Sequence, residues 1–146
     1  MTASGFDLGL GDASRAGVFF VAGDDLATLD AAARDAGLLA RRIDLLGCTN
    51  KATLLLRFAV ALDFPAGSGR NWDALSDSLR DLSWLPAPGY TLLLDGASGL
   101  HRAEGEDFDT LLSILDEARA SWADSDVPFW VFVALDDADF DEMETE

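Results

Sequence analysis

Phe129-Trp130-Val131-Phe132-Val133-Ala134-Leu135 is the longest uninterrupted apolar run of the chain. A short run rich in aromatic and β-branched residues predicts a buried strand, here over residues 129–133. Strands that are apolar throughout are typical of parallel sheets, because crossover helices cover both faces of such sheets. The run is far shorter than the ~20 apolar residues that a transmembrane helix requires, so we expect no membrane-spanning segment.

The rest of the chain alternates between further apolar runs and segments of helical periodicity. The apolar runs predict strands at residues 17–23, 42–46 and 90–94. The periodic segments predict helices at residues 26–35, 51–62, 71–82 and 107–120, and residues 96–106 are expected to be irregular. This alternation implies an α/β fold with a small, mainly parallel sheet of three to four strands and helices packed on it.

The composition restricts the kind of partner that this protein can have. The chain of 146 residues carries 27 acids and 10 bases, for a formal net charge of −17. Such a charge argues against nucleic acid as a direct ligand, since phosphate neutralisation requires Lys and Arg, and it argues equally against anionic membrane surfaces. It favours basic partners, metal cations or simple solubility.

Residue patterns that would support catalysis are weak. His101 is the only histidine and Cys48 the only cysteine, so no His/Cys set with metal-ligand spacing exists. The glycines at 67 and 69 follow a predicted helix instead of a strand, and no Gly-Lys-Ser/Thr comes after them, so they do not form a phosphate-binding loop. We therefore expect no enzyme activity, catalytic residue, metal, cofactor or small-molecule substrate. A single cysteine fits a reducing compartment and predicts a cytoplasmic protein.

In the predicted helix after this glycine loop, the apolar and the charged side chains lie on opposite faces. Trp72, Leu75, Leu79 and Leu82 share one narrow face at 100° per residue, and we expect this face to pack on the sheet. Asp73, Asp77 and Asp81 lie opposite at a spacing of four residues, where like charges cost an isolated helix about 0.2–0.5 kcal/mol per pair. Arg80 lies three residues after Asp77 and can partly neutralise it. The pattern fits an ordinary solvated helix, or a rigid carboxylate patch that meets a basic cleft on a partner.

The same segment carries a resemblance to a known family. Its residues read Phe64-Pro65, then Gly69-Arg70-Asn71-Trp72-Asp73-Ala74-Leu75, then Asp77, Leu79, Arg80, Asp81 and Leu82. This run resembles the barstar family of intracellular ribonuclease inhibitors, and the order of elements over residues 41–135 is compatible with that family. The resemblance implies a small α/β fold with a parallel sheet. It also implies an antitoxin-like function, in which the protein occludes the active site of a basic ribonuclease.

The resemblance also implies which residues bind the partner. They are the residues of the loop and of the acidic helix, together with one acid near the start of the fourth predicted helix: Gly67, Ser68, Gly69, Asn71, Asp73, Ser76, Asp77 and Asp109. Aromatic residues are frequent in the family where this chain has Gly67 and Ser68, and the family's namesake has a tryptophan where this chain has Ser76. Buried aromatics are common interface anchors.

Two other functions stay open. The chain can be an acidic interaction module of the same fold whose basic partner is not a nuclease, which the departures at Gly67 and Ser76 favour. It can also be an enzyme that uses clustered carboxylates with Mg²⁺, although such sites need ligands from several elements.

We expect residues 1–146 to form a single domain. Residues 1–16 are expected to be a loose leader, 17–38 a strand and helix that extend the sheet, 41–135 the barstar-like region and 136–146 a solvated acidic tail.

Overall fold

The computed structural model describes residues 9–65, 67 and 69–136, and this part of the chain forms one four-stranded sheet. The strands are β1 (Val18–Ala22), β2 (Leu39–Asp44), β3 (Tyr90–Asp95) and β4 (Phe129–Leu135). They pair in the order β1-β4-β3-β2, and each of the three pairings is parallel. The predicted α/β class with a parallel sheet is confirmed. The two central strands, β3 and β4, are the most deeply buried, because both of their faces are covered.

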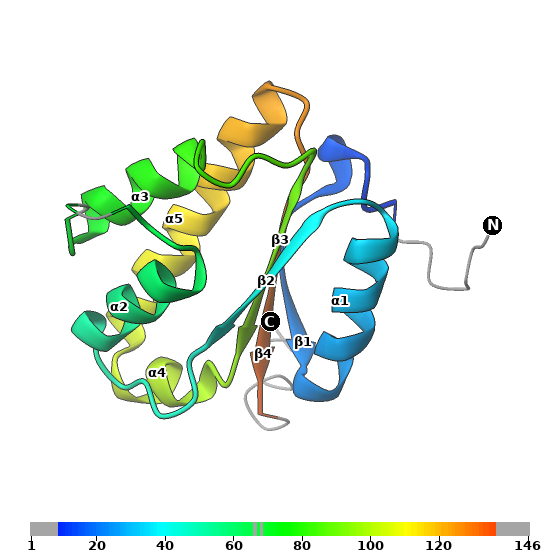
Figure 1. The fold of residues 1–146 in the computed structure, drawn as a ribbon. Helices are drawn as coiled ribbons and strands as arrows, with labels where there is room; N and C mark the ends of the chain where they lie inside the picture. The colour runs from blue at the N-terminus through cyan, green and yellow to red at the C-terminus, as the bar shows by residue number, and fades with distance from the viewer. Residues whose placement is uncertain (1–8, 66, 68, 137–146) are drawn as a thin grey trace.

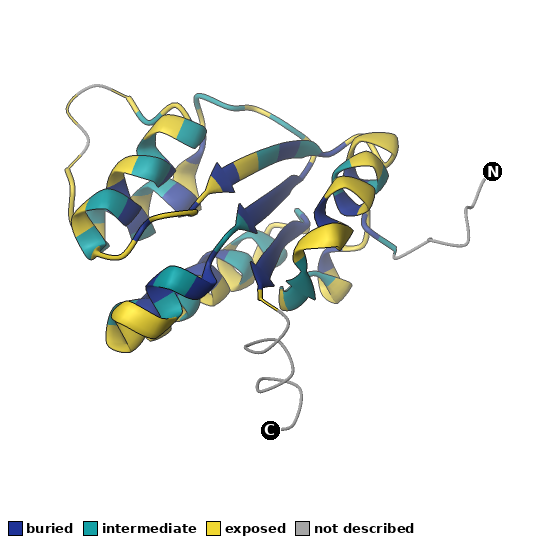
Figure 2. Cartoon of the chain, turned by 90° about the horizontal axis from the view of Figure 1, so that it is seen from below, coloured by how far each residue is buried: buried dark blue, intermediate teal, exposed yellow. Residues whose placement is uncertain are grey.

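Helices cover the two faces of the sheet unequally (Figure 1). One face carries α1 (Leu26–Asp35), and the other carries α2 (Lys51–Ala61), α3 (Trp72–Asp81), α4 (Ser98–Ala103) and α5 (Gly105–Asp124). Successive strand residues point to opposite faces, so β4 supplies both cores. Phe129 and Val131 enter the core beneath α2, α3 and α5, whereas Trp130 and Phe132 enter the core beneath α1. Figure 2 shows the buried strands between helices whose outer faces are exposed.

The first strand and helix enlarge the sheet at one edge and cover one face. β1 is an edge strand that pairs with β4, in a register that runs from Val18 opposite Val131 to Ala22 opposite Leu135. Leu26, Leu29 and Ala33 of α1 are buried in the core with Trp130. The predicted helix at residues 26–35 is confirmed.

The expected loose leader is wrong for residues 9–16, whereas residues 1–8 lie outside the described residues. Leu10 and Ala13 are buried, and residues Ala13–Arg15 form a turn of 3₁₀ helix. The indole nitrogen Nε1 of Trp130 donates a hydrogen bond of 2.8 Å to the carbonyl of Leu10. The sequence does not predict this contact, because the segment is polar and glycine-rich and its buried residues are too few to create a periodic pattern.

The second strand begins three residues earlier than predicted and ends at Asp44. Its register with β3 pairs Leu39 with Tyr90 and Asp44 with Asp95. Both ends of β2 are therefore set by its pairing with β3. After Asp44 the chain leaves the sheet in a turn, in which the Asp44 carboxylate accepts a hydrogen bond from the Leu46 amide and Gly47 has a φ of 78°. Leu46 is 72% exposed there and does not belong to a strand.

The segment 96–106, predicted as irregular, contains α4 and the beginning of α5. Leu100 is fully buried, so tertiary packing stabilises a helix too short to show a sequence period. Gly99 and Gly105 are weak helix formers, so the sequence of this segment did not predict a helix. At the end of β4, Asp136 forms an ion pair of 2.9 Å with Arg102 of α4. The remainder of the predicted acidic tail, residues 137–146, lies outside the described residues.

The helix α5 has 20 residues, which extends the predicted range of 107–120 at both ends. Its buried side, with Phe108, Leu111 and Leu115, faces the core, and its other side exposes Asp116 and Glu117. None of the helices in the described part of the chain is both long and apolar enough to cross a membrane.

Candidate protein-binding site

The acidic helix α3 begins and ends at well-defined caps. The side-chain oxygen Oδ1 of Asn71 accepts a hydrogen bond of 2.8 Å from the amide of Ala74, which satisfies one of the free amides of the first turn. At the other end Leu82 adopts a left-handed conformation with a φ of 49°. The predicted helix is thus confirmed over Trp72–Asp81, with the two predicted end residues as its caps.

The apolar face of α3 holds the helix against α5. Leu75 and Leu79 are buried, and Trp122 of α5 donates a hydrogen bond of 2.7 Å from Nε1 to the carbonyl of Leu79. The main neighbour of α3 is α5, and both helices lie on the same side of the sheet (Figure 1). Leu75 and Leu79 belong to the same buried core as Leu92 of β3, so this face is buried in the core that covers the sheet, as expected.

Asp73, Asp77 and Asp81 are all exposed, and we call these three residues the acidic face of α3. Asp77 pairs with Arg80 across 2.8 Å, as the spacing predicted, yet its side chain remains 77% exposed. An exposed pair of this kind contributes about 0–1 kcal/mol, so Arg80 can release the carboxylate at little cost. The neighbouring Ser76 is half-buried.

The loop before α3 approaches the first turn of the helix closely. Gly67 is exposed and has a φ of 91°, a conformation that glycine adopts without strain. A Cβ atom at Gly69 would lie 3.2 Å from the Cβ of Ala74, so a side chain there would crowd the helix. Ser68, which belongs to the predicted binding set, lies outside the described residues.

Asp109 is exposed on α5, the helix that supports α3. It lies thirteen residues before Trp122, which is about 20 Å along a helix at 1.5 Å per residue. No hydrogen bond or ion pair among the described residues joins Asp109 to the acidic face of α3. Its contribution to the same binding surface therefore stays a prediction.

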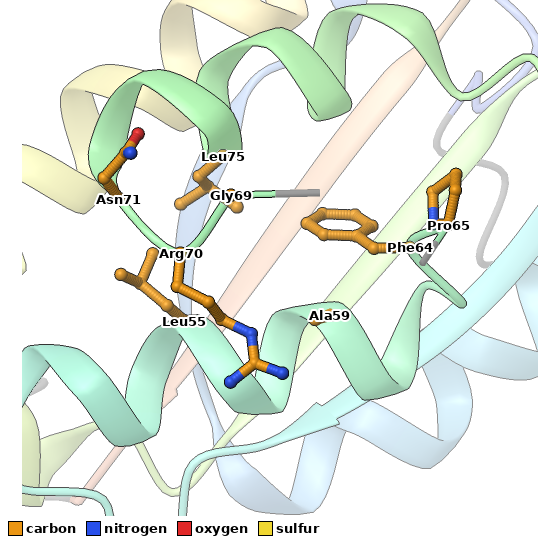
Figure 3. Close-up of a pocket in the computed structure, with 8 residues that line it drawn as sticks. All are labelled: Leu55, Ala59, Phe64, Pro65, Gly69, Arg70, Asn71 and Leu75. Atoms are coloured by element: carbon orange, nitrogen blue, oxygen red, sulfur yellow. The ribbon is translucent and has the colours of Figure 1, made fainter. Parts of the chain in front are cut away.

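A small pocket between α2 and the loop was not predicted from the sequence. Its walls come from three segments, α2, the loop and the start of α3, and consist of Leu55, Ala59, Phe64, Pro65, Gly69, Arg70, Asn71 and Leu75 (Figure 3). The accessible space is about 50 Å³. Leu55 and Ala59 belong to the apolar side of a predicted helix, but no sequence pattern indicates that a loop leaves a space above them.

Removal of the Asn71 cap is expected to destabilise α3. The Asn71→Ala variant loses the hydrogen bond to the Ala74 amide, which costs about 0.5–2 kcal/mol of the free energy of unfolding. Urea denaturation monitored by circular dichroism measures this change. Asn71→Asp retains an accepting oxygen and is expected to stay near the wild-type stability, and equal stability of the Ala and Asp variants would contradict the role of the cap.

Other reactive side chains are placed away from the acidic face of α3. Burial raises the pKa of the Cys48 thiol, which makes its reactive thiolate scarce at neutral pH. His101 is half-buried and its ring lies 5.0 Å from that of Phe108. No group of three or more His, Cys, Asp or Glu side chains suited to a metal ion occurs in the described residues.

The fold and this surface define an acidic α/β domain in which α3 exposes three carboxylates. Residues 38–134 match the family described as Barstar (barnase inhibitor), which covers well over half of the chain. The chain belongs to the barstar family. The family is one of inhibitors, so a protein partner is the general expectation for its members.

Further comparisons concern the fold. No curated protein matches the chain. Among solved structures, the chain is similar to the Aeropyrum pernix ORC2 protein in its ADPNP–ADP complexes, with a TM-score of 0.54 and 19% identity. The match covers 90% of this chain and 37% of that protein, so it spans only a little over a third of the other chain. At this identity the likeness shows a shared fold and nothing about activity.

Proposed function

We propose that this protein inhibits a basic ribonuclease by covering its active site with the acidic face of α3 and the preceding loop. The observation that carries the proposal is the exposure of Asp73 and Asp77 on a rigidly packed helix, in a chain of the barstar family. A ribonuclease active site attracts RNA phosphates with basic groups. Two carboxylates held about one helical turn apart offer the same negative charge without a bond that the enzyme can cleave.

Long-range attraction supports the same proposal. The chain carries a net charge of −17, and the acidic face of α3 adds three exposed carboxylates at one place. Complementary charge raises the rate of encounter with a basic protein and suppresses acidic competitors, and this steering is known from the namesake pair of the family itself. A basic cleft would also neutralise the repulsion among the three aspartates.

Titration of the protein into barnase and other small basic ribonucleases tests the proposal directly. We expect 1:1 binding by calorimetry, loss of RNA cleavage at the same stoichiometry, and weaker binding at high salt. Lysozyme, a basic protein without nuclease activity, is the control and should bind far more weakly. Failure to bind any ribonuclease of the panel would contradict the proposal.

A second candidate keeps the surface and changes the partner to a basic protein that is not a nuclease. The observation in its favour is the absence of a freely exposed aromatic side chain at positions 64, 65, 67 and 69–81. The two aromatics there, Phe64 and Trp72, are half-buried, Phe64 against Trp84 and Trp72 beneath Lys51. Equal binding of lysozyme and the ribonucleases would favour this candidate.

Both candidates assign a binding role and no catalysis to the protein. Asp73 and Asp77 lie on one helix, whereas a magnesium site requires ligands that converge from several elements. We place the protein in the cytoplasm, where a reducing environment suits the single buried cysteine at position 48.

A further inference from the structure

The described residues of the proposed interface offer no large apolar side chain that is free to anchor a partner. Interfaces of high affinity usually contain a few large side chains that fill pockets on the partner. In the part of the loop and helix that the structure describes, the two large aromatics are engaged within the protein, since Phe64 packs edge-on against Trp84 at 5.8 Å and Trp72 lies beneath Lys51. The three carboxylates of the acidic face supply attraction and orientation. They do not supply a buried apolar contact.

The pocket between α2 and the loop lies next to this surface. Asn71 forms part of its wall and also caps α3, whose first turn carries Asp73 (Figure 3). The floor consists of Leu55 and Leu75, which are buried. A partner that covers the loop and the first turn of α3 therefore also covers the mouth of the pocket.

Two residues of the pocket wall, Phe64 and Asn71, are held in place by contacts within the protein. Phe64 is fixed by its contact with Trp84, and the Nε1 of Trp84 donates a hydrogen bond of 2.9 Å to the carbonyl of Leu62. Asn71 is fixed by its bond to the amide of Ala74. A preformed pocket costs little ordering entropy on binding, so an occupant retains most of the gain from apolar burial.

Size and lining select the chemical class of the occupant. A cavity that accepts benzene has about 150 Å³, so a space of about 50 Å³ is too small for an aromatic ring. It suits the end of an aliphatic side chain against Leu55, Ala59 and Phe64. Arg70 lies at the same pocket, and its guanidinium offers donors to a carbonyl oxygen near such a side chain.

We propose that this pocket is the anchor point of the interface and receives an aliphatic side chain from the basic ribonuclease. The usual arrangement is then reversed, because the inhibitor supplies the pocket and the nuclease supplies the protruding residue. The inference rests on the proposed function, since the occupant belongs to the same partner. It adds an apolar determinant of specificity that the charge of α3 cannot provide.

Filling the pocket tests the inference. Ala59→Leu places a branched side chain in the space that the occupant needs, without changing any charge, and we expect the affinity for barnase, or for the tightest ribonuclease of the panel, to fall by about tenfold or more. Val60→Leu is the matched control, because Val60 is the next residue of α2, does not line the pocket and is 69% exposed. Its affinity should equal that of the wild type. Thermal unfolding verifies the fold, and Ala59→Met replaces Ala59→Leu if the leucine variant is destabilised.

The outcomes separate this inference from the proposed function. The pocket is supported as the anchor if the position 59 variant binds more weakly and the Val60→Leu control does not. Unchanged binding by Ala59→Leu or Ala59→Met, together with weaker binding by Asp77→Ala, overturns the pocket and leaves the proposed function intact. If no ribonuclease of the panel binds, the proposed function fails and the assigned occupant fails with it.

Discussion

Asp77→Ala is expected to weaken ribonuclease binding by about 2–5 kcal/mol, which corresponds to a loss of roughly 30-fold to a few thousand-fold in affinity. The measurements behind that range include those on the namesake pair of the family. The loss is large because the basic groups of the nuclease would stay covered by the inhibitor without a counter-charge. Most of the effect should appear in a faster dissociation rate, measured by surface plasmon resonance or stopped-flow fluorescence.

Asp116→Ala provides a matched control for this variant. Asp116 is exposed on α5 and pairs with Arg119 three residues later at 2.8 Å, as Asp77 does with Arg80. Both variants remove one negative charge and one exposed ion pair, so their stabilities should differ little from that of the wild type. Equal affinities of the Asp77→Ala and Asp116→Ala variants would show that only net charge matters and would remove the acidic face of α3 as the binding site.

Deletion of residues 1–37 is expected to destabilise the protein strongly, although the remaining chain contains the whole family region. The deletion removes β1 and α1 and so uncovers Trp130 and Phe132 on one face of β4. Full burial of each large apolar side chain contributes about 1.5–3 kcal/mol, so the loss reaches the size of a small domain's total stability. Thermal unfolding measures it, and an unchanged melting temperature would contradict the proposed single domain of residues 1–146.

A pair of point variants tests the same contact if the shortened chain does not fold. Leu29→Ala removes a buried side chain of α1 and should cost about 2–5 kcal/mol of the free energy of unfolding. Leu46→Ala makes the same chemical change at a position that is 72% exposed, and should change stability by no more than about 0.5 kcal/mol. Similar values for the two variants would mean that α1 adds little to the fold.

The sequence by itself determined the class of fold and the acidic helix. The run Phe129–Leu135 has no polar residue, and a strand without a polar face must be covered on both sides, which already implies a sheet between two helix layers. The helix Trp72–Asp81 was also predictable, because its apolar and acidic residues separate at the helical period and Asn71 provides a cap. The family resemblance in the same segment then indicated which residues are expected to bind a partner.

Only the tertiary structure decided which surfaces meet. The apolar face of α3 packs against α5, Leu10 covers Trp130 across 120 residues of sequence, and the pocket at Leu55 and Ala59 lies under a loop from the next connection. The physical reason is that periodicity shows which side of an element avoids water but does not show what covers it. That choice depends on the shapes of side chains far apart in the sequence, which come together only when the whole chain has folded.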